Sequence, residues 1–467
     1  MDKHKVKHRL WLRIAVLLNF ILLAVPFVLS LYAGYVFGGS MMLYRKGYWL
    51  VVALFVILYI AFGHTYDAFS VSRSRVAETV YSQGLALLFA DGVMYIVLSL
   101  LSLRFVNAVP LLVAFGLQLL LAMLWAFLTQ RIYFATFPPE RTAIVYDAGR
   151  DVGDLVQEHG LEKKYKIVAT MTLEECLADG VKLPEELETV FICGVDSHNR
   201  NVILKYCMER DIRVLVLPRV GDVIMSGAKR MHMFHLPFLY VERYNPPVEY
   251  LVFKRCLDLL VSVVLSVITL PIMLVIALAI KIEDRGPVLY RQSRLTKDGK
   301  VFMILKFRSM RVDAEKDGGA RLSTGSEDDR VTKVGRFIRK VRIDELPQLF
   351  NILRGDMSLV GPRPERPEIA AEYEETLPEF KLRLQAKAGL TGYAQVYGKY
   401  NTTPYDKLQM DLMYISNPTI LEDLRILMAT IKILFLPEST EGVAKGQRTA
   451  LVEELATTEE NGEEQNG

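Results

Sequence analysis

Two adjacent carboxylates, Asp344 and Glu345, lie in the segment RIDELPQL, between an arginine and a proline. Pro347 is tolerated in the first turn of a helix but not in its interior, so the stretch predicts a helix that begins near Asp344 and ends at Gly355. Both carboxylates then occupy the helix N-terminus, where free amides and the helix dipole favour ionised carboxylates and can help hold a phosphate. An ionised aspartate is what phosphoryl transfer to a side chain requires.

The sequence around this acidic pair offers few other nucleophiles. All seven histidines precede Gly286, and the only nearby cysteine is Cys256. Serine-histidine and cysteine-histidine schemes are therefore excluded within this domain, and carboxylates, lysines and arginines must do any chemistry. Adjacent acidic residues are nevertheless common in this chain, so the alternative interpretation of the pair alone is a solvated turn.

Several basic residues near the pair could offset the charge of a diphosphate. Arg363 stands between the two prolines of GPRP, which stiffen the backbone, while Lys306 and Arg308 belong to LKFRSM. Arg342 precedes the acidic pair by two residues. Any one of these residues is explained equally well by a solvated basic face, but together they predict an anion site at a membrane surface.

The elements that must position this chemistry begin with a membrane region in residues 1–135. Four apolar runs have about the length needed to cross a bilayer as helices, and a cleaved signal peptide is a competing interpretation for the first run. Basic residues near the span ends are concentrated on one side, which the positive-inside rule places in the cytosol. The sequence therefore predicts four transmembrane helices with both ends cytosolic, near residues 10–32, 48–62, 85–103 and 109–128.

Residues 136–245 are predicted to form an α/β domain with a parallel sheet. Short β-rich runs, such as TAIVYDA and TVFICGV, alternate with polar stretches of helical spacing. A dinucleotide fold would place G-x-G-x-x-G after the first strand, but Asp147 and Val152 stand at the first and third glycine positions around Gly149. Because an aspartate would repel a pyrophosphate, the sequence predicts a degenerate Rossmann-like domain with a structural or regulatory role.

A fifth apolar run, about residues 257–280, contains Pro271 near its middle and Asp258 at its N-terminal, polar end. The proline predicts a kink or break, and an ion pair with Lys254 or Arg255 could hold Asp258 at the interface. A complete crossing would place the basic segments that follow outside the cell, against the charge rule. We therefore expect a re-entrant membrane helix, and an ordinary fifth span is the competing interpretation.

Composition limits the remaining choices. The net charge of +3 is too small to indicate nucleic-acid binding, so no nucleic-acid partner is expected. The four cysteines share no C-x-x-C spacing, so neither disulfides nor a zinc site is predicted, and a reducing, cytosolic setting fits. Residues 441–467 form an acidic tail that is poor in aromatic residues and is expected to be disordered.

The stretches KRCLD, GPVLYRQSR, KFRSM, DELPQLFNILRGDMSLVGPRP, GLTGYAQV and DLMYISNPTILEDLRILMATIKI lie between Lys254 and about Leu436. Together they resemble the catalytic domain of the bacterial sugar transferases, which are polyprenyl-phosphate hexose-1-phosphate transferases or monotopic phosphoglycosyl transferases. Four spans and a degenerate α/β domain ahead of it are similar to the large members of that family. The expected fold is thus a membrane protein of α plus α/β class, with a mainly α catalytic domain in residues 246–440.

The resemblance implies a two-step exchange. Asp344 would be the nucleophile that attacks the sugar-bearing phosphorus of a UDP-sugar, expels UMP and holds a phosphosugar, while Glu345 would bind Mg²⁺. Polyprenyl phosphate, undecaprenyl phosphate in particular, would then attack this adduct and yield a polyprenyl-diphospho-sugar that initiates exopolysaccharide, capsule or related glycan synthesis. Arg363 would clamp the diphosphate, with Arg308 and Arg342 as helpers and Lys306 as a further donor.

The implied enzyme is a multi-pass protein of the cytoplasmic membrane with its catalytic domain on the cytosolic face. Its partners would be a UDP-sugar, polyprenyl phosphate and the lipid bilayer, while the identity of the sugar and a homodimer are left open. One alternative is a polytopic lipid phosphotransferase, but the spans offer little beyond Asp67 and Asp91, both expected at span edges. The other is a non-catalytic membrane scaffold or regulator, which should have lost the acidic pair or the arginines, and neither is lost.

Overall fold

The described residues of the computed structural model are 3–36, 45–72, 74–147, 161–178, 180–311, 330–398 and 402–434. Two expectations fall outside these ranges, namely the acidic tail and the two fingerprint positions Gly149 and Val152. The chain divides into two compact units, Met1–Pro218 and Arg219–Gly467. The domain borders expected near residues 135 and 245 stay predictions.

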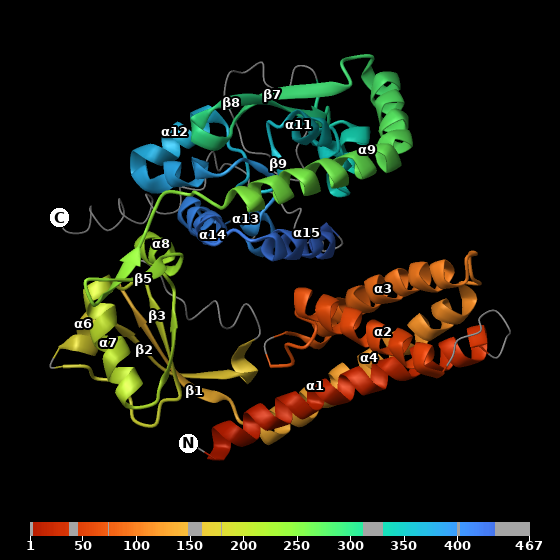
Figure 1. Ribbon diagram of the computed structural model, residues 1–467. Coiled ribbons are helices and arrows are strands. Elements are labelled where there is room, and N and C mark those ends of the chain that lie inside the picture. Colours follow the sequence, from red (N-terminus) through yellow and green to blue (C-terminus); the bar gives the residue numbers. More distant parts are fainter. Residues whose placement is uncertain are drawn as a thin grey trace. The chain divides into compact units, whose positions relative to one another are not determined.

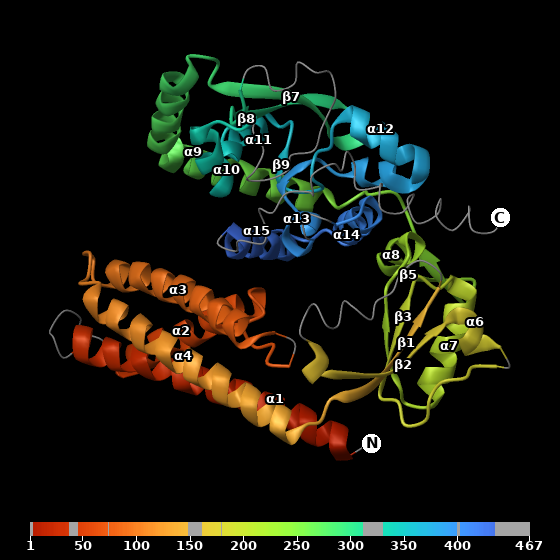
Figure 2. The same cartoon turned by 180° about the vertical axis from the view of Figure 1, so that it is seen from behind.

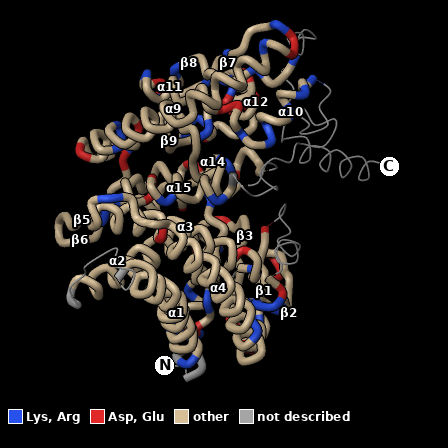
Figure 3. Tube along the Cα trace, turned by 90° about the vertical axis from the view of Figure 1, so that its right-hand side faces the viewer, with Lys and Arg blue, Asp and Glu red and all other residues tan. Residues whose placement is uncertain are grey.

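Within the described ranges, five helices are long and apolar enough to cross a membrane. Four belong to the first unit and overlap the four predicted runs. Figures 1 and 2 show them alongside one another, and Figure 3 shows long stretches without charged residues along them. They are α1 (Lys3–Ser30), which continues as a π-helical turn (Leu31–Val36), α2 (Arg45–Thr65), α3 (Val76–Leu101) and α4 (Val109–Thr136).

The outer surface of these helices is apolar, whereas polar groups between them form internal hydrogen bonds. Leu17 is 57% exposed, for example. The buried Tyr59 hydroxyl donates to Oδ1 of Asn19 at 2.8 Å, and Nε2 of Gln118 donates to the carbonyl of Leu23 at 3.1 Å. Such a surface suits a lipid environment, where polar groups must find partners within the protein. The four crossings themselves stay a prediction.

The expectation that Asp91 lies at the edge of a span is wrong. Asp91 lies within α3 and is 7% exposed. The reason is that α3 begins at Val76, earlier than the apolar run, and its first turn is held by the Glu78 carboxylate, which accepts from the backbone N–H of Arg75 at 3.2 Å. Asp67, by contrast, lies in the turn after α2.

The first unit also contains a small parallel sheet, as predicted, with strand order β2-β1-β3-β4. Its core includes Val145, Val190 and Ile192 from the strands and Ile203 from a following helix. Asp147, the described residue of the degenerate fingerprint, directly follows the first strand. The elements are β1 (Glu140–Tyr146), β2 (Tyr165–Thr172), α6 (Leu173–Leu177), β3 (Thr189–Cys193), α7 (Ser197–Glu209) and β4 (Arg213–Val216).

The second unit is built from helices and short strand pairs around two hydrophobic clusters, one of which joins α9 to α10. Val220 and Val223 at its start pack into the same core as Ile352 and Leu408, so this segment belongs to the second unit. Its elements are α8 (Val220–Ser226), β5 (Lys229–Met233), β6 (Leu236–Tyr240), α9 (Val248–Asp284), β7 (Leu289–Leu295), β8 (Val301–Phe307), α10 (Lys333–Lys340), α11 (Gln348–Arg354), β9 (Ser358–Val360), α12 (Pro367–Thr376), β10 (Gly389–Thr391), α13 (Tyr393–Tyr397), α14 (Pro404–Ser416) and α15 (Ile420–Leu434).

Helix α9 contains the fifth apolar run and holds Pro271 in its interior. Figures 1 and 2 both show that its two parts point in different directions. A bend is expected in a helix with an internal proline, which lacks the backbone N–H and clashes with the preceding turn. The re-entrant course of α9 through a membrane stays a prediction.

The ion pair expected between Asp258 and Lys254 or Arg255 is wrong. Asp258 is 5% exposed and accepts hydrogen bonds from the Ser358 hydroxyl at 2.8 Å and from a backbone N–H of β9 at 2.9 Å. Lys254 pairs with Asp423 at 3.0 Å, and Arg255 donates to carbonyl groups near the end of α11. These three side chains therefore attach α9 to the rest of the second unit.

Candidate active site

The acidic pair lies in a 3₁₀ turn, Ile343–Glu345, and α11 begins only at Gln348. The predicted helix start at the pair is therefore wrong, while the predicted end at Gly355 is confirmed by a left-handed glycine with φ of 95°. Pro347 explains the difference, because it has no N–H to donate to the carbonyl four residues earlier. The N–H of Leu346 instead bonds to the carbonyl of Ile343 at 3.1 Å, which keeps the turn tight.

Glu345 is contacted by two cations from distant parts of the sequence. Its Oε1 lies 2.9 Å from Nζ of Lys306, at the end of β8, and 3.3 Å from Nη2 of Arg363, which follows β9. Burial alone would raise the pKa of Glu345, but the charges of Lys306, Arg363 and Arg342 lower it below its usual range. Glu345 is therefore ionised across the physiological range.

Asp344 lies in a contrasting environment. Burial and the neighbouring Glu345 charge raise the pKa of Asp344 to about 6, against the opposing effect of Lys306, Arg339 and Arg363. No hydrogen bond joins the Asp344 carboxylate to another described residue. Such a carboxylate is ionised at neutral pH, is more basic than an ordinary aspartate and remains free to form a bond.

Glu345 lines a cavity that is open to solvent and has about 240 Å³ of empty space, and Asp344 precedes this lining residue in the 3₁₀ turn. Glu345, Lys306 and Arg363 line it, so the structure brings three of the predicted site residues together at one surface. The remaining lining residues come from β7, β8, α11, the segment after β9, and β10, and they are Arg294, Ile304, Gln348, Pro364, Gly389 and Leu390.

Arg294 is a residue of this cavity that the sequence reasoning missed. Its Nη1 donates to the carbonyl of Pro364 at 3.0 Å, and burial lowers its pKa to about 10. In the antiparallel pair β7–β8, Arg294 faces Phe302 while Tyr290 faces Lys306. Residues two apart share one face of a strand, so the alternation in GPVLYRQSR could have placed Arg294 on the same face as Lys306.

The other two predicted cations have different positions. Arg308 is 6% exposed and forms a close ion pair with Asp284 at the end of α9, rather than with the acidic pair. Its guanidinium packs over Gly286, where a Cβ atom would lie 2.2 Å from Nη1. Arg342 adopts a left-handed conformation with φ of 54° just before the acidic turn, and its charge contributes to the lowered pKa of Glu345.

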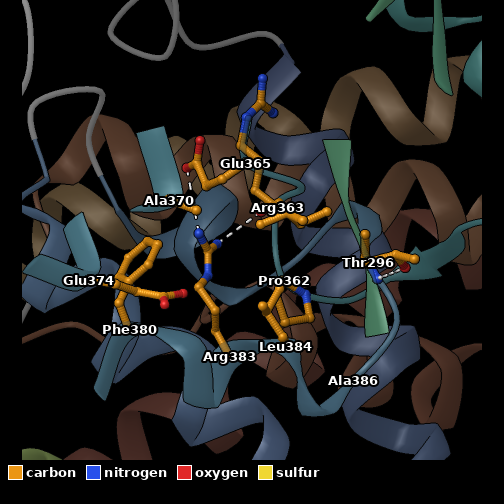
Figure 4. Close-up of a pocket in the computed structure, with 12 residues that line it drawn as sticks. Thr296, Pro362, Arg363, Glu365, Ala370, Glu374, Phe380, Arg383, Leu384 and Ala386 are labelled. Carbon is orange, nitrogen blue, oxygen red and sulfur yellow. Dashed lines mark hydrogen bonds and ion pairs between the residues drawn. The ribbon is translucent and has the colours of Figure 1, made fainter. Parts of the chain in front are cut away.

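A second charged cluster supports the segment that carries Arg363 (Figure 4). The buried Arg383 pairs with Asp411 at 2.6 Å and with Glu365 at 3.5 Å, and it donates to the backbone carbonyl of Arg363 at 2.9 Å. Figure 4 shows the Arg383 guanidinium pointing toward both Glu365 and the Arg363 segment. A further cavity beside it, with about 320 Å³ of empty space, also has Arg363 in its wall. Arg383 therefore fixes the backbone from which Arg363 reaches Glu345.

Comparison with known proteins identifies the family to which this chain belongs. A family model described as Bacterial sugar transferase matches residues 249–437, which include every residue of the 240 Å³ cavity. The UDP-glucose:undecaprenyl-phosphate glucose-1-phosphate transferase of Caulobacter vibrioides is 42% identical over 191 residues, which cover 40% of this chain and 71% of that relative. The chain belongs to the bacterial sugar transferase family.

Two other relatives are matched over less of their length. The UDP-N-acetylgalactosamine-undecaprenyl-phosphate N-acetylgalactosaminephosphotransferase of Aeromonas hydrophila is 40% identical over 234 residues, 50% of this chain and 54% of the relative. A UDP-glucose:undecaprenyl-phosphate glucose-1-phosphate transferase of Klebsiella pneumoniae is 42% identical over 194 residues, 40% of this chain and 41% of the relative. The sugar transferase match thus spans about half the length of these two proteins, whose names specify different sugars.

The donor set of the sugar transferase cavity fits the magnesium ion that the resemblance implies. Nowhere in the described ranges do three or more His, Cys, Asp or Glu side chains form a cage for a metal. Mg²⁺ does not require one, because it commonly binds one or two carboxylates and takes its other ligands from phosphate oxygens and water. Glu345 supplies a carboxylate at the cavity, where Lys306 and Arg363 both contact its Oε1, and Asp344 is the adjacent carboxylate in the chain.

Proposed function

We propose that this sugar transferase moves a sugar 1-phosphate from a UDP-sugar to polyprenyl phosphate, undecaprenyl phosphate in particular, with release of UMP. The product would initiate exopolysaccharide, capsule or related glycan synthesis. The observation that carries the proposal is the cavity where Glu345 meets Lys306, Arg294 and Arg363, with the adjacent Asp344 carboxylate left without a hydrogen-bond partner among the described residues. The pKa values of the two carboxylates are shifted in opposite directions. The names of the relatives support the same substrate classes.

In the first step, a carboxylate oxygen of Asp344 forms a bond to the sugar-bearing phosphorus. The bond from that phosphorus to UMP breaks, UMP leaves with the electron pair, and the sugar phosphate remains on Asp344 as an acyl phosphate. Lys306, Arg363 and Arg294 line the cavity in which the charge on the leaving phosphate grows, and they stabilise it. The raised pKa of Asp344, about 6, leaves its carboxylate ionised and nucleophilic near pH 7.

In the second step, an oxygen of polyprenyl phosphate forms a bond to the phosphorus of the adduct. The bond from this phosphorus to Asp344 breaks, the carboxylate is regenerated, and a polyprenyl-diphospho-sugar is released. Mg²⁺ held by Glu345 would neutralise phosphate charge. Lys306 and Arg363 keep Glu345 in place throughout, because both contact the same carboxylate oxygen.

The proposal includes a site at the cytosolic face of the cytoplasmic membrane, with α1–α4 crossing it and α9 entering one leaflet and returning. The charge bias of the sequence near the predicted span ends and the bend of α9 support this arrangement. The end of α9 is paired through Asp284 with Arg308, which lies two residues beyond Lys306 in the chain. A helix suited to lipid and a strand that carries a phosphate-binding lysine are therefore joined directly.

The experiment that tests the proposal uses membranes that contain the protein, together with Mg²⁺ and undecaprenyl phosphate. A panel of radiolabelled UDP-sugars, including UDP-glucose, UDP-galactose and their N-acetylated forms, would be added one at a time. We expect labelled lipid and an equal amount of UMP from at least one of them, and neither from membranes without the protein. Absence of both products with every sugar nucleotide would contradict the proposal and favour a non-catalytic scaffold that has kept the fold.

A further inference from the structure

Helix α10 carries a mixed apolar and basic stripe on its exposed side. Phe337 is 63% exposed and Val341, directly after the helix, is 40% exposed. Lys333, Arg336 and Lys340 are exposed beside them, at the spacing that brings helical residues onto one side. The helix contains no acidic residue. We call these five residues the α10 stripe.

The opposite side of α10 is attached to the membrane-compatible helix α9. Ile338 is buried in a cluster with Met273, Ile276 and Ile280 of α9, and Val334 packs against the same cluster. The Glu283 carboxylate near the end of α9 also accepts hydrogen bonds from the first N–H groups of α10, at 2.8 Å from Lys333. The α10 stripe is therefore fixed next to the C-terminal part of α9.

We propose that the α10 stripe is a docking surface for anionic phospholipid head groups. Phe337 and Val341 would enter the boundary between head groups and acyl chains, and the three cations beside them would contact lipid phosphates. Charge complementarity favours anionic lipid, because the stripe has three positive charges and α10 has no negative one. Continuity with α9 favours a membrane over a soluble partner, a choice that rests on the membrane placement in the proposed function.

Helix α10 directly precedes the acidic turn in the chain, so the position of the α10 stripe affects the position of the active site. Lys340 ends the helix, Arg342 turns the chain with a left-handed conformation, and Asp344 follows within the 3₁₀ turn. The depth of the α10 stripe in the membrane therefore sets the height of the acidic pair above the lipid surface, where the phosphate of a polyprenyl lipid would arrive.

The test uses the full-length protein in nanodiscs with a fluorophore at position 337. The variant Phe337→Cys is made in a Cys256→Ser background, because Cys256 is the exposed native cysteine of the described chain. Doxyl-labelled lipids then report contact by quenching. We expect quenching about twofold stronger in discs with phosphatidylglycerol than in discs of phosphatidylcholine alone, and weakened by 1 M salt, where the screening length is about 3 Å.

Three comparisons make the test decisive. A fluorophore at Glu372→Cys, an exposed position of α12, should show no such quenching. Replacing Lys333, Arg336 and Lys340 together by glutamine should remove the difference between the two lipids. Asp344→Asn should leave the quenching unchanged, so failure of the proposed reaction would not affect this result.

Quenching at position 337 no stronger than at position 372 would overturn the docking surface and point to a protein partner. Equal quenching in both lipids that the glutamine replacements do not alter would overturn the preference for anionic lipid. If Phe337→Cys fails to fold, the fluorophore at Val341→Cys gives the same measurement from the same stripe.

Discussion

Two charged clusters of the second unit meet at Arg363 but are built in opposite ways. In the support cluster, the guanidinium of Arg383 is enclosed by Asp411, Glu365 and the carbonyl of Arg363. In the site cluster, Glu345 is paired with Lys306 and Arg363 while Asp344, the adjacent carboxylate, has a raised pKa and no hydrogen bond to a described residue.

The difference separates rigidity from reactivity. A buried arginine whose three side-chain nitrogens each have a partner, as in Arg383, resists movement and fixes the backbone attached to it. A carboxylate whose neighbours raise its pKa without binding it remains available to form a bond. The second unit thus places a reactive group beside a closed network and connects the two through one arginine, so substitutions in the two clusters should have separable effects.

Apart from loss of the Asp344 nucleophile itself, the largest expected effect is a fall in turnover for Glu345→Gln. The change removes the charge expected to hold Mg²⁺ and the partner of Lys306 and Arg363. We expect UMP release to fall about 10³-fold, the order seen when one charge-stabilising group is lost from an active site. The matched control Glu372→Gln, on the exposed side of α12, should leave turnover unchanged. Activity above a tenth of the wild-type rate for Glu345→Gln would show that the site cluster does not act as described.

Arg383→Met tests the support cluster through stability. Breaking a buried ion pair from one side leaves Asp411 buried without its partner, so we expect a loss of about 3–5 kcal/mol in the free energy of unfolding, seen as a lower unfolding temperature in detergent. Arg425→Met removes an exposed ion pair with Glu422 and should cost at most about 1 kcal/mol. Equal unfolding temperatures for the two variants would contradict the stabilising role given to the ion pairs of Arg383.

Arg294→Gln addresses a residue at the edge of the site cluster. The variant loses a cation that lines the cavity, and we expect KM for the UDP-sugar to rise about tenfold, as for loss of one charged hydrogen bond. Arg291→Gln is the matched control on the same strand, because Arg291 points to the opposite face of β7 and is exposed. Similar KM values for the two variants would remove Arg294 from the substrate site.

The smallest expected effect is a pH dependence of the wild-type protein. Asp344 is active when ionised, and its pKa is raised to about 6, so turnover should fall as pH decreases through about 6, to about a tenth at pH 5. Because the Glu345 charge raises the pKa of Asp344, the residual activity of Glu345→Gln should fall only at lower pH. A wild-type profile that is flat from pH 7 to pH 5 would contradict this assignment.

Sequence reasoning could locate the residues of the site cluster because local signals mark them. Pro347 and Gly355 delimit a short helix, and the prolines around Arg363 restrict its backbone. The exact start of α11 was missed because a single absent N–H at Pro347 converts the first turn to 3₁₀ geometry. Arg308 could not be separated from Lys306, since only the packing against Asp284 and Gly286 shows that it serves α9.

The support cluster had no local signal at all. Arg383 and Asp411 are 28 residues apart, and Asp258 finds its partner Ser358 at a separation of 100 residues. Such contacts depend on how the strands and helices pack, so they could not be predicted from the periodic pattern of any single segment. The fold class was easier, because the apolar runs of α1–α4 and the short β-rich runs are properties of single segments.

The central claim is that Asp344 carries the phosphosugar, and the most direct measurement is to trap that adduct. The protein would be incubated with Mg²⁺ and a UDP-sugar labelled with ³²P in the sugar-bearing phosphate, without polyprenyl phosphate, and then denatured. We predict up to one label per chain, an equal burst of UMP, release of the label by hydroxylamine, and no label on Asp344→Asn. Label retained by folded Asp344→Asn, or lipid product formed by it at a near-normal rate, would contradict the account.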